Sequence, residues 1–196
     1  ISLDKRFTET ELDKIQKEAT IDQWYSKCLG YIAYKLRTKK EIWTYLSTKS
    51  DLDDKEKNKI ISKLLKNNYL NDLEYAKCYL EDCKNKNRGK RYFINHLQSL
   101  GVDQTIIYQV LLEFDEEAML ENLIVKYQKE ELRLINYPII IQKHKLTEKM
   151  ARNGISMDTI NRVISNINFS EDLSVSFIKD VEKIKSKTND VSKQTA

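Results

Sequence analysis

The sequence contains little of what sharp turns and extended loops require. Of its 196 residues, four are glycine and one is proline. These two residue types supply most of the special backbone conformations of hairpins and phosphate-binding loops. Their scarcity disfavours a sheet-rich fold and a nucleotide-binding loop. The many Lys, Glu, Leu and Ile residues are instead typical of a helical protein.

Cysteines are few, and their spacing fits neither a disulfide framework nor a zinc site. Cys28, Cys78 and Cys83 each fall inside an apolar periodic segment. We interpret all three as core-filling thiols in a reducing compartment.

Long apolar runs are missing as well. No run approaches the ~20 residues that cross a bilayer, and the first residues show no signal-peptide pattern. We therefore expect no membrane association. The chain does not begin with methionine, and we expect further residues before Ile1.

Catalytic motifs are also absent from the sequence, which has no GxxxxGK[ST], GxGxxG, HExxH or GxSxG pattern. The two histidines, His96 and His144, have no carboxylate or cysteine partner at a useful spacing. The acids at 53–54 and 115–117 stand at predicted helix starts, where capping and the helix dipole explain them. We predict no enzyme activity, no metal site and no cofactor.

Apolar residues recur at helical spacing along most of the chain. We expect a short, loosely packed helix within residues 1–23, capped by Thr8 and Glu11. Further helices are predicted to begin near residues 24, 38, 53, 71, 90, 103, 116, 138 and 156. The apolar stripes of these helices include Cys28, Leu36, Ile42, Trp43, Leu46, Ile60, Leu64, Leu65, Leu80, Phe93, Leu97, Ile107, Val110, Leu123, Ile140, Ile141, Leu146, Met150 and Val163.

The helical pattern repeats with a period near 50 residues. Residues 100–114 align with residues 153–167, and this alignment pairs Gly101 with Gly154, where each preceding helix is expected to end. We predict an all-α fold of tandem three-helix repeats that form an elongated, curved, monomeric array. The predicted parts are an N-terminal segment 1–23, repeats 24–70, 71–115 and 116–168, and a polar tail 169–196. In the tail, Phe177, Val181 and Ile184 indicate one weak amphipathic helix. The alternative is the chance self-match that any helical protein shows.

Basic residues gather on the second helix of each predicted repeat, mainly near its start. If the repeats stack with a regular rotation, these charges line one face and bind an acidic partner or nucleic acid. The alternative is an ordinary solvated surface, which the net charge of +4 also allows. The candidate partner-binding residues are Lys39, Lys40, Arg88, Lys90, Arg91, Lys145, Lys149 and Arg152.

Three segments together resemble the RecX family of regulatory proteins: LRTKKEIWTYL (36–46), NNYLNDLEYAKCYLEDCKN (67–85) and RGKRYFINHLQSLGVD (88–103). The resemblance covers roughly residues 26–167. The family pattern has a glycine and an Asp pair at the first repeat junction, and this chain has Asn68 and Asn71–Asp72 there. The resemblance implies three-helix repeats and no fixed catalytic set.

The resemblance also implies a cytoplasmic protein with a function in DNA repair, recombination and the SOS response. A RecX protein is expected to lie in the groove of the filament that the RecA recombinase forms on single-stranded DNA. There it would hinder ATP turnover and strand exchange and promote disassembly. Two alternatives stay open at this point: a helical protein that binds nucleic acid directly, and a helical scaffold for another protein partner.

Overall fold

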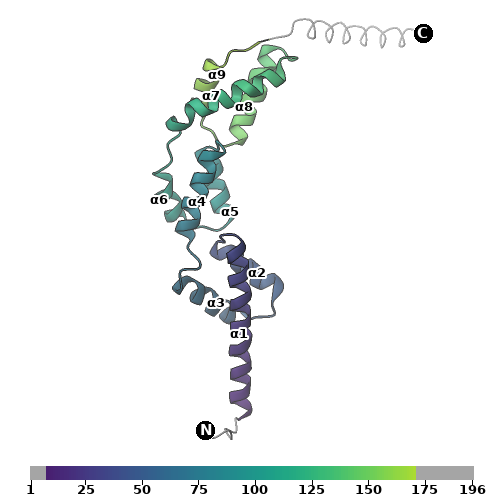
Figure 1. The fold of residues 1–196 in the computed structure, drawn as a ribbon, viewed down its shortest axis with the longest axis vertical. Helices are drawn as coiled ribbons and strands as arrows, with labels where there is room; N and C mark the ends of the chain where they lie inside the picture. The colour runs from purple at the N-terminus through teal and green to yellow at the C-terminus, as the bar shows by residue number, and fades with distance from the viewer. Residues whose placement is uncertain (1–7, 171–196) are drawn as a thin grey trace, which may run out of the picture. The chain divides into compact units, whose positions relative to one another are not determined.

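The computed structural model describes residues 8–170, and within these bounds the chain is all-α, as predicted, with no strand (Figure 1). Two 3-10 helices, η1 (Glu117–Met119) and η2 (Leu132–Leu134), flank α7. The α-helices are α1 (Glu9–Tyr34), α2 (Lys39–Lys49), α3 (Asp54–Lys66), α4 (Asp72–Asn85), α5 (Lys90–Ser99), α6 (Gln104–Leu111), α7 (Leu120–Glu131), α8 (Ile139–Arg152) and α9 (Met157–Asn166). The helix expected around Phe177 lies outside the described residues.

The chain divides into two compact units, each built from two stretches of sequence. Unit 1 comprises Ile1–Glu81 and Ile94–Glu113, and unit 2 comprises Asp82–Phe93 and Phe114–Ala196. In unit 1, α3 packs against both α1 and α2; in unit 2, α7, α8 and α9 pack against one another (Figure 1). The repeat boundaries at residues 70/71 and 115/116, and the curved array, stay predictions.

Helix α1 is longer than the sequence pattern indicated. Thr8 and Glu11 form the expected capping box, in which the Thr8 amide donates to the Glu11 carboxylate over 2.9 Å. The expectation of a separate short helix before Trp24 is wrong, because one helix runs from Glu9 to Tyr34. No proline interrupts this stretch, and a helix continues where nothing breaks its hydrogen-bond ladder. Most of the first half of α1 is exposed (Figure 1).

The core of unit 1 follows most of the predicted stripes of α1, α2 and α3. Trp43 is only partly buried, while Leu36 and Leu65 are 45% and 41% exposed, so the prediction was wrong for these last two. Leu36 follows the end of α1, and Leu65 is turned ~100° around α3 from the buried Leu64. The buried residues of this core are Cys28, Ile42, Leu46, Leu52, Ile60, Ile61, Leu64 and Leu70.

The core of unit 2 contradicts the predicted stripe of α8 at its start. Ile140 is 79% exposed and Ile141 41% exposed, whereas Gln142, Leu146 and Met150 are buried. These three residues follow one another at intervals of four, which is one side of a helix. The stripe was predicted wrongly because its first buried residue, Gln142, is polar. The buried apolar residues of unit 2 are Cys83, Phe93, Phe114, Met119, Leu123, Tyr127, Leu146, Met150, Ile155, Ile160, Val163 and Ile167.

Two asparagines explain how the chain departs from the family pattern without losing the fold. Asn68, where the pattern has glycine, adopts a φ of 60°, and asparagine tolerates this left-handed conformation better than most residues. Asn71 takes the place of an aspartate, and its side-chain oxygen accepts from the amides of Leu73 and Glu74 at 3.1 Å. Asparagine and aspartate are equally good N-caps, so the start of α4 is preserved.

The cysteines are not all buried, contrary to the prediction. Cys28 and Cys83 are buried, and burial raises the pKa of the Cys28 thiol to about 11. Cys78 is exposed. On α4 it lies two residues from each of the buried Ala76 and Leu80, and a two-residue step is ~200° around a helix. Cys78 therefore faces away from the core.

Across residues 8–170, no helix has the length and apolar character that crossing a membrane demands.

Candidate partner-binding surface

The first predicted pair of cations, Lys39 and Lys40, lies where α2 begins and packs on the turn between α5 and α6. The Thr38 hydroxyl donates to the carbonyl oxygen of Leu100 over 3.1 Å, and the Lys40 ammonium donates to that of Ser99 over 3.0 Å. A Cβ added at Gly101 would lie 2.6 Å from Cδ of Lys40. The Lys40 side chain therefore covers this turn and satisfies a carbonyl at the end of α5.

The start of α5 in unit 2 has the same arrangement against the turn between α8 and α9. The Gly89 amide donates to the carbonyl oxygen of Asn153 over 2.8 Å, and the Arg91 amide donates to that of Gly154 over 3.3 Å. Gly101 and Gly154 have φ values of 70° and 75°. The two glycines that the sequence comparison paired are thus equivalent turns, and each receives the start of a helix from earlier in the chain.

An acidic side chain completes each of these two contacts. The Lys39 amide donates to the Asp72 carboxylate over 3.0 Å, and the Lys90 amide donates to the Glu116 carboxylate over 3.3 Å. Burial raises the pKa of Asp72, although the hydrogen bond from Lys39 opposes this shift. The helix starts recur 51 residues apart, from Lys39 to Lys90, the turns 53 residues apart, and the acids 44 residues apart. This recurrence supports the predicted repeat.

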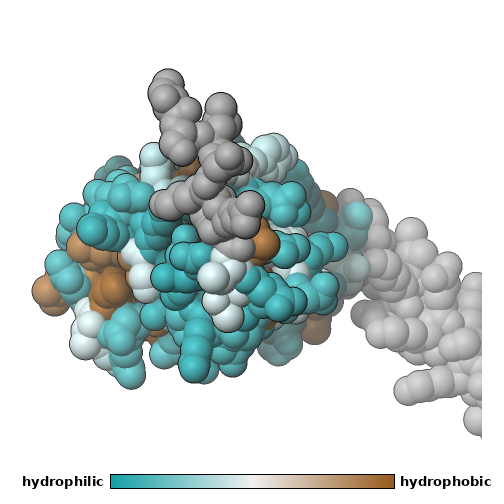
Figure 2. All heavy atoms as spheres, turned by 90° about the horizontal axis from the view of Figure 1, so that it is seen from below, coloured by the Kyte–Doolittle hydropathy of each residue, from teal (hydrophilic) through white to brown (hydrophobic). Residues whose placement is uncertain are grey.

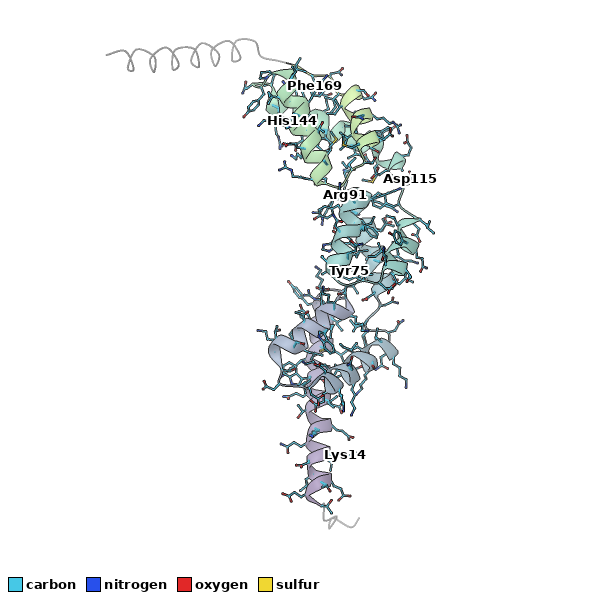
Figure 3. All side chains as sticks on the ribbon, turned by 180° about the vertical axis from the view of Figure 1, so that it is seen from behind. Lys14, Tyr75, Arg91, Asp115, His144 and Phe169 are labelled. Carbon is cyan, nitrogen blue, oxygen red and sulfur yellow. The ribbon has the colours of Figure 1, made fainter. Side chains whose placement is uncertain are left out.

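Four of the predicted cations keep exposed side chains with no hydrogen bond or ion pair in the part of the chain that the structure describes: Lys39, Lys90, Arg91 and Arg152. Arg91 lies in the first turn of α5 (Figure 3). The surface in the view of Figure 2 is largely hydrophilic with separate hydrophobic spots. Because the side chains of Lys39, Lys90, Arg91 and Arg152 are exposed and charged, charge is what these positions offer to a partner.

The other cations of unit 2 contact their own unit. The Arg88 guanidinium lies 4.3 Å from the centre of the Tyr92 ring, and the Lys145 ammonium lies 4.2 Å from that of Tyr137. Lys149 forms an ion pair of 2.7 Å with Glu130. Stacking on a ring leaves a cation charged and able to attract an anion, whereas the charge of Lys149 is already paired.

Sequence reasoning missed Lys126, although its side chain lies near the predicted residues Arg88 and Lys149. Partial burial lowers its pKa, and the nearby charges of Lys149 and Arg88 lower it further. The structure therefore brings two predicted residues, Arg88 and Lys149, together with one that was not predicted. The signal in the sequence was a run of cations at helical spacing, at 126 and 129 of α7 and 133 of the following η2. The prediction that the cations of different repeats share one face stays a prediction.

The acidic residues at helix starts have the capping role that the sequence indicated. The Asp53 carboxylate accepts from the Glu56 amide over 2.8 Å, and that of Asp115 accepts from the Glu117 amide over 2.9 Å. The Glu117 carboxylate also pairs with Arg162. Within residues 8–170, no group of three or more His, Cys, Asp or Glu side chains is placed to hold a metal ion.

Comparison with known proteins gives a consistent set of relatives. No protein-family model matches the chain. Over 165 residues, or 84% of its length, the chain is 28% identical to the Regulatory protein RecX of Bacillus cytotoxicus and 30% identical to that of Bacillus cereus. The match covers 61% of each relative, so the chain spans about three fifths of their length.

Two solved structures share the fold. A crystal structure of regulatory protein RecX aligns with a TM-score of 0.72 at 22% identity, covering 81% of this chain and 78% of that one. The crystal structure of RecX from Lactobacillus salivarius aligns with a TM-score of 0.66 at 25% identity, covering 75% of this chain and 96% of that one.

Proposed function

The chain belongs to the RecX family of regulatory proteins, and we propose that it regulates the RecA recombinase by binding the filament that RecA forms on single-stranded DNA. The observation that carries this proposal is the match to proteins named as regulatory protein RecX along 84% of the chain, together with a shared all-α fold. The resemblance of the sequence to that family connects it to RecA.

The proposed mode of action is binding without catalysis. The acids near helix starts serve as caps, and the exposed Lys39 and Lys90 stand where the starts of α2 and α5 meet residues from later in the chain. A protein with these features acts on a partner by occupying its surface. We propose that it occupies the filament groove as a cytoplasmic monomer, slows ATP turnover and strand exchange, and promotes disassembly.

Exposed cations at equivalent positions suit a filament, which presents the same surface many times. Lys39 and Lys90 occupy matching places at the starts of α2 and α5. Each alone contributes a weak, screened attraction. Several weak contacts held on one chain add to a much higher overall affinity when the partner repeats its own binding sites. The proposed contact residues are Lys39, Lys90, Arg91 and Arg152, with Arg88 and Lys145 supporting them.

The experiment that tests this proposal is a titration of the protein into RecA filaments preassembled on single-stranded DNA, at fixed salt, with ATP hydrolysis as the readout. We expect hydrolysis to fall as the protein is added. The proposal would be wrong if ATP hydrolysis stayed unchanged at the highest protein concentration and the protein did not co-sediment with the filaments.

Direct binding of nucleic acid is the second candidate function. The neighbouring cations Arg88 and Lys126 favour it, because two positive charges close together attract phosphates. It is distinguished by a salt-dependent gel shift of DNA in the absence of RecA.

A further inference from the structure

An open groove of about 520 Å³ runs along the outside of unit 2, between the end of α4 with its following turn and one side of α7. Its lining contains four cations, three asparagines, one valine and a single carboxylate. None of its lining residues belongs to the proposed contact with RecA, and only Lys126 is shared with the second candidate function. The residues that define it are Lys84, Asn87, Asn122, Lys126, Lys129 and Arg133.

The positive charge of this groove exceeds what the chain itself neutralises. Its one carboxylate, that of Glu130, is already bound by Lys149 at 2.7 Å and by Arg133 at 3.4 Å. The ammonium of Lys126 donates to the carbonyl oxygen of Lys86 over 3.1 Å, a neutral partner. An anion placed in the groove would therefore gain attraction from Lys126 and Lys129, which form no ion pair within residues 8–170. It would also attract Arg133, whose ion pair with Glu130 is long at 3.4 Å.

The remaining polar groups fit a polypeptide better than a nucleic acid. Asn85, Asn87 and Asn122 carry carboxamides, which both donate and accept, as the peptide backbone does. A phosphodiester backbone offers acceptors alone. The side-chain oxygen of Asn87 has no hydrogen-bond partner within residues 8–170, so turning it toward a peptide N–H breaks no bond.

The groove also has no surface on which bases would stack. Its lining contains no aromatic ring, whereas single-stranded nucleic acid gains much of its affinity by stacking bases on such rings. The cations at 126 and 129 of α7 and at 133 of η2 span ~10 Å along the helix axis. An extended chain covers this length in about three residues. Closely spaced carboxylates on an extended chain match this spacing.

We propose that this groove binds an acidic, extended segment of a partner protein. The inference does not depend on which protein supplies the segment, and it stands apart from the proposed action on RecA. Lys126, Lys129 and Arg133 attract the carboxylates, while the three asparagines hold the backbone of the segment and fix its register.

A direct test uses fluorescence anisotropy with the full chain and a fluorescein-labelled peptide of alternating Glu and Gly residues. A labelled peptide of alternating Gln and Gly serves as the uncharged control. We expect saturable binding of the acidic peptide that weakens with added salt, and we expect the triple variant K126E/K129E/R133E to bind at least tenfold more weakly. The matched control is K55E/K59E/K66E, which changes the net charge by the same amount at exposed positions of α3. Its affinity for the acidic peptide should stay within threefold of that of the parent.

A second pair of variants keeps the test decisive if the triple reversal does not fold, which circular dichroism would show. K129Q/R133Q removes two charges without repulsion and should weaken the acidic peptide about fivefold. Asn122→Leu removes one exposed carboxamide and should weaken it at least twofold. Equal affinity of the parent and K129Q/R133Q for the acidic peptide would overturn the proposal.

Two further outcomes would also overturn it. One is equal binding of the Glu and Gln peptides. The other is tighter binding of labelled oligo-dT than of the acidic peptide, with the same loss in K129Q/R133Q, because the groove would then be a nucleic-acid site. RecA is absent from every arm, so failure here leaves the filament proposal standing, and failure of the filament assay leaves this one standing.

Discussion

The backbone amide of Gly89 lies 2.8 Å from the carbonyl oxygen of Asn153 and donates a hydrogen bond to it. These two segments of the backbone approach so closely that a Cβ on Gly89 would lie 2.2 Å from the carbonyl oxygen of Gly154. This contact joins the start of α5 to the turn before α9 within unit 2. The equivalent contact in unit 1 joins the start of α2 to Gly101. Glycine is needed at position 89 because of close approach, whereas Gly101 and Gly154 also have positive φ.

The first prediction concerns that close approach. Gly89→Ala should lower the free energy of unfolding by roughly 1–3 kcal/mol, because the added methyl group meets backbone atoms that cannot move aside cheaply. The matched control is Gly30→Ala in the last part of α1, where the added group meets nothing within 4 Å. It should raise stability by about 0.5 kcal/mol or more, since alanine is the better helix former. Urea unfolding followed by circular dichroism measures both, and opposite signs are expected. Similar effects of the two substitutions would contradict the close approach.

The second prediction concerns thiol reactivity. Cys78 should react rapidly with a thiol reagent such as dithionitrobenzoate, while Cys28 and Cys83 should react slowly until the protein is unfolded. Burial raises the pKa of Cys28 to about 11, and only the thiolate attacks the reagent. Without denaturant, the parent should quickly release one equivalent of thionitrobenzoate, and the Cys78→Ser variant should release almost none. Fast release of three equivalents from the native parent is the result that would show the burial to be wrong.

The third prediction concerns pH. The hydrogen bond from Lys149 holds the pKa of the Glu130 carboxyl below its usual value of 4.5. A lowered pKa in the folded state means that the ion pair stabilises the protein above that usual value and loses its effect as the pH falls through the lower one. Glu130→Gln should therefore be less stable than the parent at pH 7, by roughly 0.5–1 kcal/mol for such a partly exposed pair. The gap should narrow as the pH approaches ~4.

Urea midpoints at several pH values measure this gap. Glu18→Gln, at an exposed position of α1, is the control for loss of one negative charge elsewhere. A difference between Glu130→Gln and the parent that stays constant from pH 7 downward would argue against the ion pair as its cause.

The fourth prediction concerns the exposed cations at the start of α5. The variant K90E/R91E should inhibit RecA at least fivefold more weakly than the parent, because repulsion replaces attraction at a contact that the proposed function requires. The hydrogen bonds that Lys90 and Arg91 donate come from their backbone amides, so the fold should survive the change of side chains. The control K55E/K59E carries the same change of charge on α3. Equal inhibition by K90E/R91E and the control would place the contact surface elsewhere.

The sequence predicted those parts of the fold that local chemistry determines. The cap at Thr38, the cap at Ser156 and the left-handed glycines 101 and 154 are all found where expected. Each depends on one or two residues and their neighbours along the chain. The all-α class followed from composition and period for the same reason.

What the sequence did not predict depends on contacts between residues far apart in the chain. Ile140 is apolar but exposed and Gln142 is polar but buried, because Gln142 donates to the carbonyl oxygens of Tyr137 and Ser170 at 2.8 Å and 2.6 Å. Lys40 was predicted to face a partner, yet its ammonium binds Ser99. The spacing of apolar residues predicts which side of a helix is apolar, but it does not predict which other residues cover that side.

The measurement that tests the central claim most directly is ATP hydrolysis by RecA on single-stranded DNA, with and without this protein, at fixed salt and with filaments assembled beforehand. The claim that the chain is a RecX-family regulator of RecA predicts a concentration-dependent fall in hydrolysis, together with co-sedimentation of the protein with the filaments. Full hydrolysis at every concentration, with the protein remaining in the supernatant, would contradict it.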